Sequence, residues 1–385
     1  MKRILILYIS PNTGHHTAAK SVEQALLKSD GEIEVLIVNA LNYISPFFEK
    51  IILKTYLSVL KNTPELWEFL YDNNKIKDRI SPLRSIVLRQ QSQKLFRLIN
   101  EYHPDVVLCT QAYPCQIIGE YKHECAVPFE LMAVITDYVV HAYWVSQRVD
   151  HYMMPHQEGL QKMAGYGIDL NRMSITGIPV DPVFNRTLDK TLLKKQMGLP
   201  ENLPVILIMG GGQCLIPVKD ILDGLAKIRM PHRIIVVTGT NKSLFGSMMH
   251  YKQKHCPSMH VFAYVHEIDK LMEVSDLLIS KPGGLSSSEA MVKDLPMLIY
   301  RPLPGQESKN ADFLTKNGVA LRAEEISEIT DKVEMLFKDN VLLKSLKDKI
   351  LLMKRPDAAS DIAKVILHQV PQQPVSAGQS LGSYA

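Results

Sequence analysis

The feature that most constrains this chain is an alternation of short apolar runs with longer helical patterns, which occurs twice along the sequence. In the first half the apolar runs are 4–9, 35–38, 106–109 and 131–135. Strands that alternate with helices in this way are typical of β-α-β units on a parallel sheet. The first half therefore predicts an α/β domain.

The alternation restarts after a break at 176–185, TGIPVDPVFN, whose two prolines and glycine disfavour a continued helix or a central strand. The later apolar runs are 205–209, 234–238, 260–262, 277–280 and 297–300. A chain of 385 residues is also too long for one ordinary core. We therefore expect two Rossmann-like domains, 1–176 and 177–369, whose parallel sheets face a cleft, and a disordered tail at 370–385.

Composition limits the cellular compartment and the kind of membrane contact that we expect. The five cysteines form no CxxC pair, which favours a reducing cytoplasm over a disulfide framework or a zinc site. No apolar run reaches the roughly 20 residues of a spanning helix, so membrane contact is expected to be peripheral. The net charge of +4 is small, but residues 43–100 alone carry ten Lys or Arg against five acids. No nucleic-acid partner is expected.

The turn after the first strand, SPNTGHHTAAKSVEQAL, places small residues and two histidines at the start of a helix. Backbone N–H groups there can stabilise an anion. His15 or His16 can act as a general base, because an unperturbed imidazole pKa near 6.5 allows proton acceptance at neutral pH. A capping or packing histidine is the alternative reading.

Two glycine turns follow strands of the second half. MGGGQC at 209–214 lets the backbone approach a ligand, although a tight strand-to-helix turn would have the same sequence. SKPGGLSSSEAM at 280–291 joins a buried strand to a serine-rich helix start that can hold a diphosphate. Glu289 then falls about 6 to 9 Å inside this helix, a reach suited to ribose hydroxyls.

Polar residues also follow two further strands. Gln306, Glu307 and Asn310 supply the donors and acceptors that discriminate sugar hydroxyls. In the first half, Asp137 follows a strand in ITDYVVHAYW and is a candidate for orienting the base, while His141 and Trp144 either line an acceptor entrance or pack in the core.

With these segments in place, the chain resembles the monogalactosyldiacylglycerol synthases and bacterial processive diacylglycerol glucosyltransferases. These are relatives of the transferase that adds N-acetylglucosamine to lipid I. The matching segments are GHHTAA, TDYVVHAYW, TGIPVDPVF, MGGG, VVVTGTNKSL, AYVHEIDKLMEVSDLLISKPGGLSSSEA and PGQESKNADF, in family order over nearly 1–314.

The resemblance implies a GT-B fold with a UDP-sugar held mainly by the second domain and a lipid acceptor by the first. His16 matches the family's proposed base, with His15 where many members have glycine, so the choice between the two stays open. The expected donor-site residues are Gly14, Gly211, Gly212, Val265, Pro282, Gly283, Gly284, Ser286, Glu289, Gln306, Glu307 and Asn310.

The predicted reaction is an inverting hexosyl transfer from a UDP-sugar to diacylglycerol or a related glycolipid, on the inner face of the cell membrane. No DxD motif occurs, so the helix end and loop N–H groups are expected to stabilise the leaving diphosphate without a metal or other cofactor. The segment ISPFFEKIILKTYLSVL mixes apolar side chains with lysines, which is typical of contact with anionic lipid. A core-facing amphipathic helix is the alternative.

Three other functions remain open at this point. One is a UDP-N-acetylglucosamine-dependent transferase with another lipid-linked acceptor, one is a UDP-sugar epimerase, and one is a nucleotide-sugar sensor without turnover.

Overall fold

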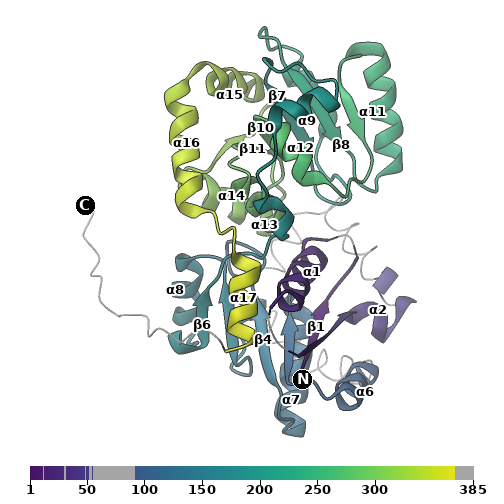
Figure 1. Cartoon of the computed structure of the whole chain (residues 1–385), viewed down its shortest axis with the longest axis vertical. Coiled ribbons are helices and arrows are strands. Elements are labelled where there is room, and N and C mark those ends of the chain that lie inside the picture. Colours follow the sequence, from purple (N-terminus) through teal and green to yellow (C-terminus); the bar gives the residue numbers. More distant parts are fainter. Residues whose placement is uncertain (12, 30–31, 48, 52–53, 55–91, 369–385) are drawn as a thin grey trace, which may run out of the picture.

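The computed structural model describes residues 1–11, 13–29, 32–47, 49–51, 54 and 92–368. Two α/β lobes are stacked along the long axis of the molecule, the first half of the chain forming one lobe and most of the second half the other (Figure 1). Most of the basic stretch at 43–100 and the tail at 370–385 lie outside the described residues.

The first lobe is built on a parallel sheet with the strand order β2-β1-β3-β4-β5-β6. Its strands are β1 Lys2–Tyr8, β2 Ile33–Asn39, β3 Val106–Cys109, β4 Glu130–Val134, β5 His151–Met154 and β6 Met173–Ile175. Its helices are α1 Gly14–Leu27, α2 Ala40–Ile44, α6 Gln93–Tyr102, α7 Ala112–Cys125, η1 Ala142–Trp144, α8 Gln157–Gly165 and η2 Leu170–Arg172. The apolar runs predicted the first four strands, whereas β5 and β6 are short and carry polar residues that hid them.

The second lobe repeats the design with the order β12-β11-β10-β7-β8-β9, again all parallel. Its strands are β7 Val205–Met209, β8 Arg233–Val237, β9 His260–Phe262, β10 Leu277–Ser280, β11 Met297–Tyr300 and β12 Ala320–Ala323. The helices are η3 Pro182–Asn185, α9 Lys190–Gln196, α10 Val218–Leu225, α11 Lys242–His255, α12 Ile268–Val274, α13 Gly284–Val292, α14 Gln306–Lys316, α15 Ile326–Lys338, α16 Asn340–Met353 and α17 Ala358–Ile366. Five of its six strands coincide with the predicted runs.

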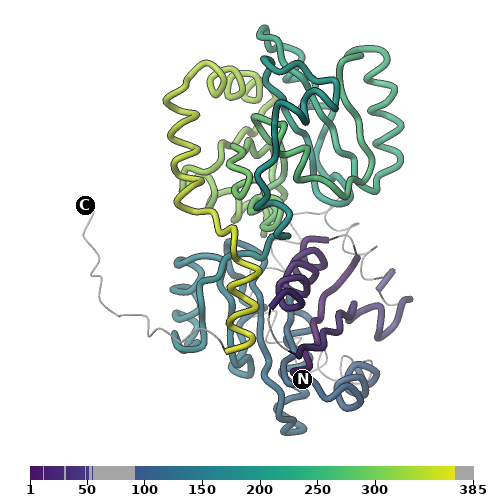
Figure 2. Tube along the Cα trace, in the orientation of Figure 1, coloured from purple at the N-terminus to yellow at the C-terminus, as the bar shows by residue number. Residues whose placement is uncertain are grey.

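Helix α17 departs from the predicted division of the chain, which gave the second domain all residues up to 369. After α16 the chain crosses back, and α17 lies in the first lobe beside α1 (Figure 2). Ile362 and Ile366 join the core cluster that contains Ile4 and Ile6 of β1. The apolar face of α17 is therefore buried by the first sheet, so the C-terminal helix belongs structurally to the first domain.

The two chain crossings between the domains pack against each other. Gly177, in the predicted linker, has a φ of +91°, and a Cβ atom there would lie 2.5 Å from the Cβ of Arg355 in the second crossing. Glycine is therefore required at 177 for both its backbone conformation and the contact. The two crossings are therefore closely packed at Gly177 and Arg355.

Candidate functional site

The carboxyl ends of the two sheets face each other, and two turns meet between them. Gly14, at the start of α1, would place a Cβ atom 3.4 Å from the Cβ of Leu285 in α13. A Cβ atom on Gly284 would lie 2.1 Å from the carbonyl oxygen of Thr136, which follows β4. The histidine-bearing turn and the expected diphosphate turn therefore lie on the same cleft.

His15 is held from two sides in this cleft. Its Nδ1 lies 2.9 Å from the carbonyl oxygen of Thr110 and 3.0 Å from Oγ1 of Thr136. Because a carbonyl oxygen can only accept, the contact with Thr110 places the proton on Nδ1 and leaves Nε2 as the basic nitrogen. Burial lowers the pKa of His15, and the charge of Asp137 opposes that effect. The imidazole is thereby kept neutral and basic at Nε2.

His16 has different surroundings. Its ring stacks on Tyr8 of β1, with ring centroids 4.5 Å apart. Burial lowers its pKa, and the charge of Lys20 lowers it further. The sequence left the choice of base open, and the geometry favours His15, because the buried partners that fix a tautomer contact His15 and the aromatic stack holds His16.

Asp137 does not hold the histidine in the way that the sequence suggested. Its Oδ1 accepts a hydrogen bond of 3.0 Å from Nδ2 of Asn310 in α14, and the groups that hydrogen-bond the His15 ring are Thr110 and Thr136. Asp137 therefore acts on His15 through its charge, because its carboxylate is engaged with the second domain.

Two of the predicted hexose ligands also join the domains. Asn310 is fully buried, and its amide donates to Pro282 O and accepts from Val139 N in addition to its bond to Asp137. Gln306 donates from Nε2 to Val139 O over 3.1 Å. These side chains bind the 137–139 loop in the structure, and contact with a hexose by either stays a prediction.

Glu307 remains beside the expected diphosphate turn. Its Oε1 pairs with Nζ of Lys281 at 2.8 Å, and its Oε2 accepts from Leu303 N. The Lys281 side chain also borders Gly211, whose φ is +73° and whose added Cβ atom would lie 3.3 Å from Lys281 Cε. One cation thus links the MGGG turn, the PGG turn and the first turn of α14.

A second close contact between glycines lies at the same end of the second sheet. The carbonyl of Gly212 accepts from both N and Oγ1 of Thr240, and a Cβ atom on Gly239 would lie 2.3 Å from that carbonyl oxygen. Val265 is partly buried on the adjoining core cluster. The turns after β7 and β8 therefore lie together at the carboxyl end of the second sheet.

Helix α13 carries the remaining predicted residues. Gly283 is its N-cap, Pro282 is buried just before it, and Ser286 is partly buried in its first turn. Glu289 is buried inside the helix, where desolvation and then the charge of Asp181 raise its pKa to about 8. A carboxyl group in this state is mostly protonated at neutral pH, and hydroxyl donors of a ligand would favour its ionised form.

The sequence analysis missed Thr110 and Thr136 as hydrogen-bonding partners of His15. It also missed Tyr138, whose hydroxyl lies 2.6 Å from Oγ of Ser288 in a buried contact between the domains. A signal existed, since Thr110 and Thr136 each come shortly after a buried strand, where side chains reach the cleft. Choosing them required knowing which strands are neighbours.

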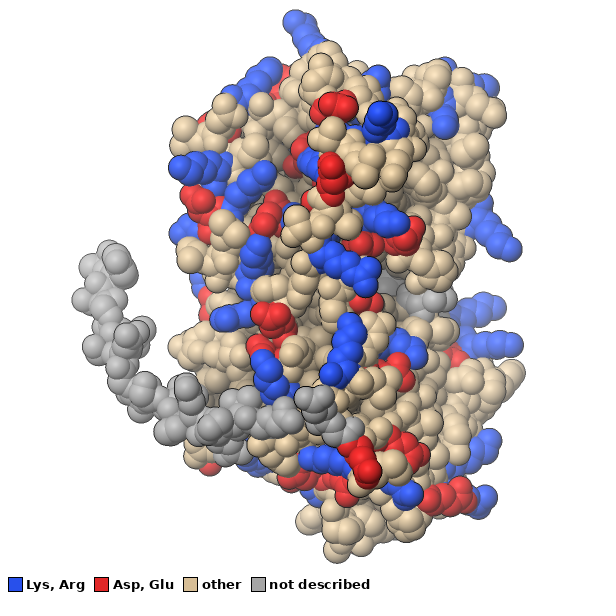
Figure 3. All heavy atoms as spheres, viewed as in Figure 1, with Lys and Arg blue, Asp and Glu red and all other residues tan. Residues whose placement is uncertain are grey.

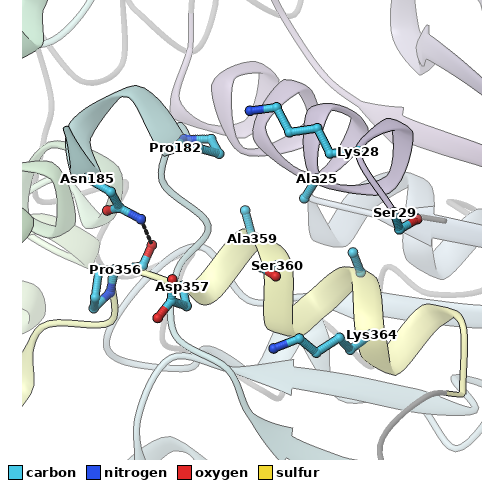
Figure 4. Close-up of a pocket in the computed structure, with 11 residues that line it drawn as sticks. Ala25, Lys28, Ser29, Pro182, Asn185, Pro356, Asp357, Ala359, Ser360 and Lys364 are labelled. Atoms are coloured by element: carbon cyan, nitrogen blue, oxygen red, sulfur yellow. Dashed lines mark hydrogen bonds between the residues drawn. The ribbon is translucent and has the colours of Figure 1, made fainter.

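A cavity of about 420 Å³ lies elsewhere, between the end of α1, η3 and α17 (Figure 4). Its lining includes Lys28, Asn185 and Lys364, and contains none of the predicted site residues. On the face drawn in Figure 3, basic and acidic side chains are interspersed. Within the part of the chain that the structure describes, no cluster of three or more His, Cys, Asp or Glu could hold a metal ion.

Comparison with known proteins adds two family matches. Residues 15–180 match the model for monogalactosyldiacylglycerol (MGDG) synthase, and residues 205–364 match the glycosyltransferase family 28 C-terminal domain. The processive diacylglycerol beta-glucosyltransferase of Bacillus pumilus (strain SAFR-032) is 29% identical over 370 residues, which covers 96% of this chain and 95% of that protein.

Solved structures share the architecture at low identity. Acinetobacter baumannii MurG superposes with a TM-score of 0.64 at 14% identity, covering 96% of this chain and all of that one. The UDP-GlcNAc 2-epimerase of Neisseria meningitidis, bound to UDP-GlcNAc, gives 0.60 at 13% identity over 95% of this chain and all of that one. The fold is therefore GT-B, and the fold alone does not separate transferases from epimerases.

Proposed function

We propose that this chain, a GT-B glycosyltransferase in which an MGDG synthase domain precedes a family 28 C-terminal domain, transfers a hexose from a UDP-sugar to diacylglycerol or a related glycolipid. The observation that carries the proposal is the meeting of the His15 turn with the PGG turn across the cleft. The name of the Bacillus pumilus relative, a processive diacylglycerol beta-glucosyltransferase, supports glucose as the hexose and diacylglycerol as the acceptor.

The chemistry is a single displacement. The acceptor hydroxyl gives its proton to Nε2 of His15 while its oxygen forms a bond to the anomeric carbon. The bond from that carbon to the diphosphate breaks, and the electron pair leaves with UDP. Attack from the side opposite the leaving group inverts the anomeric centre, so an α-linked UDP-sugar gives a β-glycoside.

The second domain supports departure of UDP. The N-terminus of α13, preceded by Gly283, presents backbone N–H groups, and Lys281 adds a positive charge. Such donors stabilise charge that develops on a diphosphate. We assign the phosphates to this turn, the ribose to Glu289 and the hexose to Glu307. Metal-independent turnover is part of the proposal, and full activity in excess EDTA would support it.

We also propose that the protein contacts the membrane surface peripherally. Tyr43, Phe47 and Ile51 are 41%, 74% and 46% exposed beside the exposed Lys50 and Lys54. Apolar side chains among cations fit an anionic bilayer surface. Ile52, Leu53, Tyr56 and Leu57 of the predicted segment lie outside the described residues, as does Phe48. No helix among the described residues is long and apolar enough to span a bilayer.

All five cysteines are free thiols. Free thiols are typical of proteins in a reducing compartment, and we propose that the reaction takes place on the inner face of the cell membrane.

The decisive experiment incubates the purified chain with labelled UDP-glucose, UDP-galactose or UDP-N-acetylglucosamine and diacylglycerol, and reads the lipid product by mass spectrometry. A β-hexosyl lipid supports the proposal. An epimerised UDP-sugar would establish the epimerase, and binding without turnover would establish a sensor. If N-acetylglucosamine is the only sugar transferred, the donor is UDP-N-acetylglucosamine and not a UDP-hexose.

A separate flotation assay tests the membrane surface. Phe47→Ser should reduce recovery with liposomes that contain anionic lipid, whereas Leu352→Ser serves as the matched control, because Leu352 is 80% exposed on α16 of the other domain. Equal recovery of wild type on neutral and anionic liposomes would contradict charge-dependent contact.

A further inference from the structure

A second polar cluster lies at the carboxyl end of the first sheet, beside the histidine turn. Glu49 is 5% exposed. Its Oε1 accepts from Nδ2 of Asn39 at 2.7 Å, and its Oε2 accepts from Nδ2 of Asn42 at 2.6 Å. Each carboxyl oxygen has two lone pairs, so each can accept one further hydrogen bond. Glu49 is therefore held in one orientation and retains capacity for a ligand.

The sheet register places this carboxyl group next to an aromatic pair. Asn39, which ends β2, is the register partner of Tyr8, which ends β1, and neighbouring strands lie about 4.8 Å apart. Tyr8 stacks on His16 with an interplanar angle of 25°. Burial raises the pKa of the Tyr8 phenol, the charge of Lys20 lowers it, and the charge of Glu49 raises it. Glu49 thus acts electrostatically on Tyr8.

The cluster adjoins the base. His16 of the aromatic pair follows His15 directly, and consecutive Cα atoms are about 3.8 Å apart. A fixed carboxyl group, amide groups and an aromatic wall are the side chains that bind sugar hydroxyls, since the hydroxyls need paired donors and acceptors and the C–H faces need apolar contact. Diacylglycerol has a single hydroxyl group and no sugar ring, so it needs fewer of these contacts than a glycolipid does.

We propose that Glu49, with Tyr8 and His16, binds the hydroxyl groups of a sugar already carried by the acceptor lipid, and so determines how well a glycolipid is used relative to diacylglycerol. This assignment rests on the proposed hexosyl transfer to lipids. Glu49 is a specificity-determining residue in this scheme, and His15 remains the base.

The test measures kcat/KM of the full-length protein with UDP-glucose and either diacylglycerol or monoglucosyldiacylglycerol in matched detergent micelles. Glu49→Gln should lower the ratio of glycolipid use to diacylglycerol use by about tenfold, the usual effect of losing a hydrogen bond to a charged group. Tyr8→Phe keeps both Asn–Glu49 bonds and should lower the same ratio by about threefold, within the range for a neutral hydrogen bond.

Glu32→Gln is the matched control, because Glu32 is exposed just before the opposite end of β2; it should keep the wild-type ratio. Thermal unfolding of each variant separates a folding defect from a change of acceptor preference. If Glu49→Gln does not fold, the ratio of glycolipid use to diacylglycerol use in Tyr8→Phe tests the proposal.

Three outcomes would overturn the assignment: a wild-type ratio in both variants, an equal loss on both acceptors, or a wild type that uses diacylglycerol and ignores the glycolipid. Failure of the proposed function has a different signature, since wild type would then transfer hexose to neither lipid.

Discussion

Burial favours the neutral form of one ionisable group on each side of the cleft, by shifting the two pKa values in opposite directions. His15, in the first domain, is hydrogen-bonded at Nδ1, and burial lowers its pKa. Glu289, in the second domain, is buried in α13 and its pKa is raised to about 8. In the proposed reaction, Thr110 and Thr136 therefore orient the base before substrate binds, whereas ionisation of Glu289 would require hydroxyl donors from the ligand.

The largest expected effect tests the acceptor side. His15→Ala should lower kcat by at least about 100-fold, the usual contribution of a general base, while UDP affinity stays close to wild type. His16→Ala is the matched comparison and should cost less, because its ring contacts Tyr8. Steady-state kinetics and UDP titration of both variants provide the measurement. A larger loss of kcat in His16→Ala would return the base role to His16.

The next effect tests the contact between the turns. Gly284→Ala places a methyl group 2.1 Å from Thr136 O, so the domains must move apart at a cost of about 1–3 kcal/mol. Gly283→Ala has nothing within 4 Å of its new Cβ atom and should lose much less activity. Turnover and small-angle scattering would detect the difference. Equal kinetics of the two variants would show that closure does not depend on this contact.

The donor side is tested through pH. UDP binding should favour ionised Glu289, so wild-type affinity should rise as pH increases towards and through about 8, while Glu289→Gln should lack this rise. Calorimetry in buffers of different ionisation enthalpy should also detect proton release by wild type. A wild-type affinity that is flat over this range would remove Glu289 from the ribose site.

The same carboxyl group affects stability. Because its folded pKa of about 8 exceeds its ordinary value of 4.5, the folded state binds a proton that the unfolded state has lost between these values. Stability therefore falls as pH rises through this window. The Tm of wild type should decline more than that of Glu289→Gln between pH 6 and pH 9, and parallel declines would contradict the raised pKa.

The smallest effect tests the buried bond between the domains. Tyr138→Phe removes a hydroxyl that lies 2.6 Å from Ser288 Oγ, while Ser288 still donates to Gly284 O. The expected loss is about 1 kcal/mol of stability, the net contribution of one hydrogen bond. Chemical denaturation provides the value. Leu352→Ser, at an exposed position of α16, should stay near wild type.

The sequence alone determined the architecture, and it predicted the turns where we propose the chemistry takes place. Apolar periodicity identified nine of the strands, because a parallel strand that is buried on both faces must be continuously apolar. The glycine and histidine turns were predicted as site segments for a similar local reason, since a turn after such a strand lies at the ligand-binding edge of its sheet.

Tertiary structure decided which side chains meet. Thr110 and Thr136 hold His15 because β1, β3 and β4 are neighbours in the sheet, and Asn310 reaches Asp137 across the domain boundary. Helix α17 leaves the second domain because its apolar face is buried by the first. These contacts join residues distant in the chain, and a local pattern carries no information on strand order or on the packing of one domain against another.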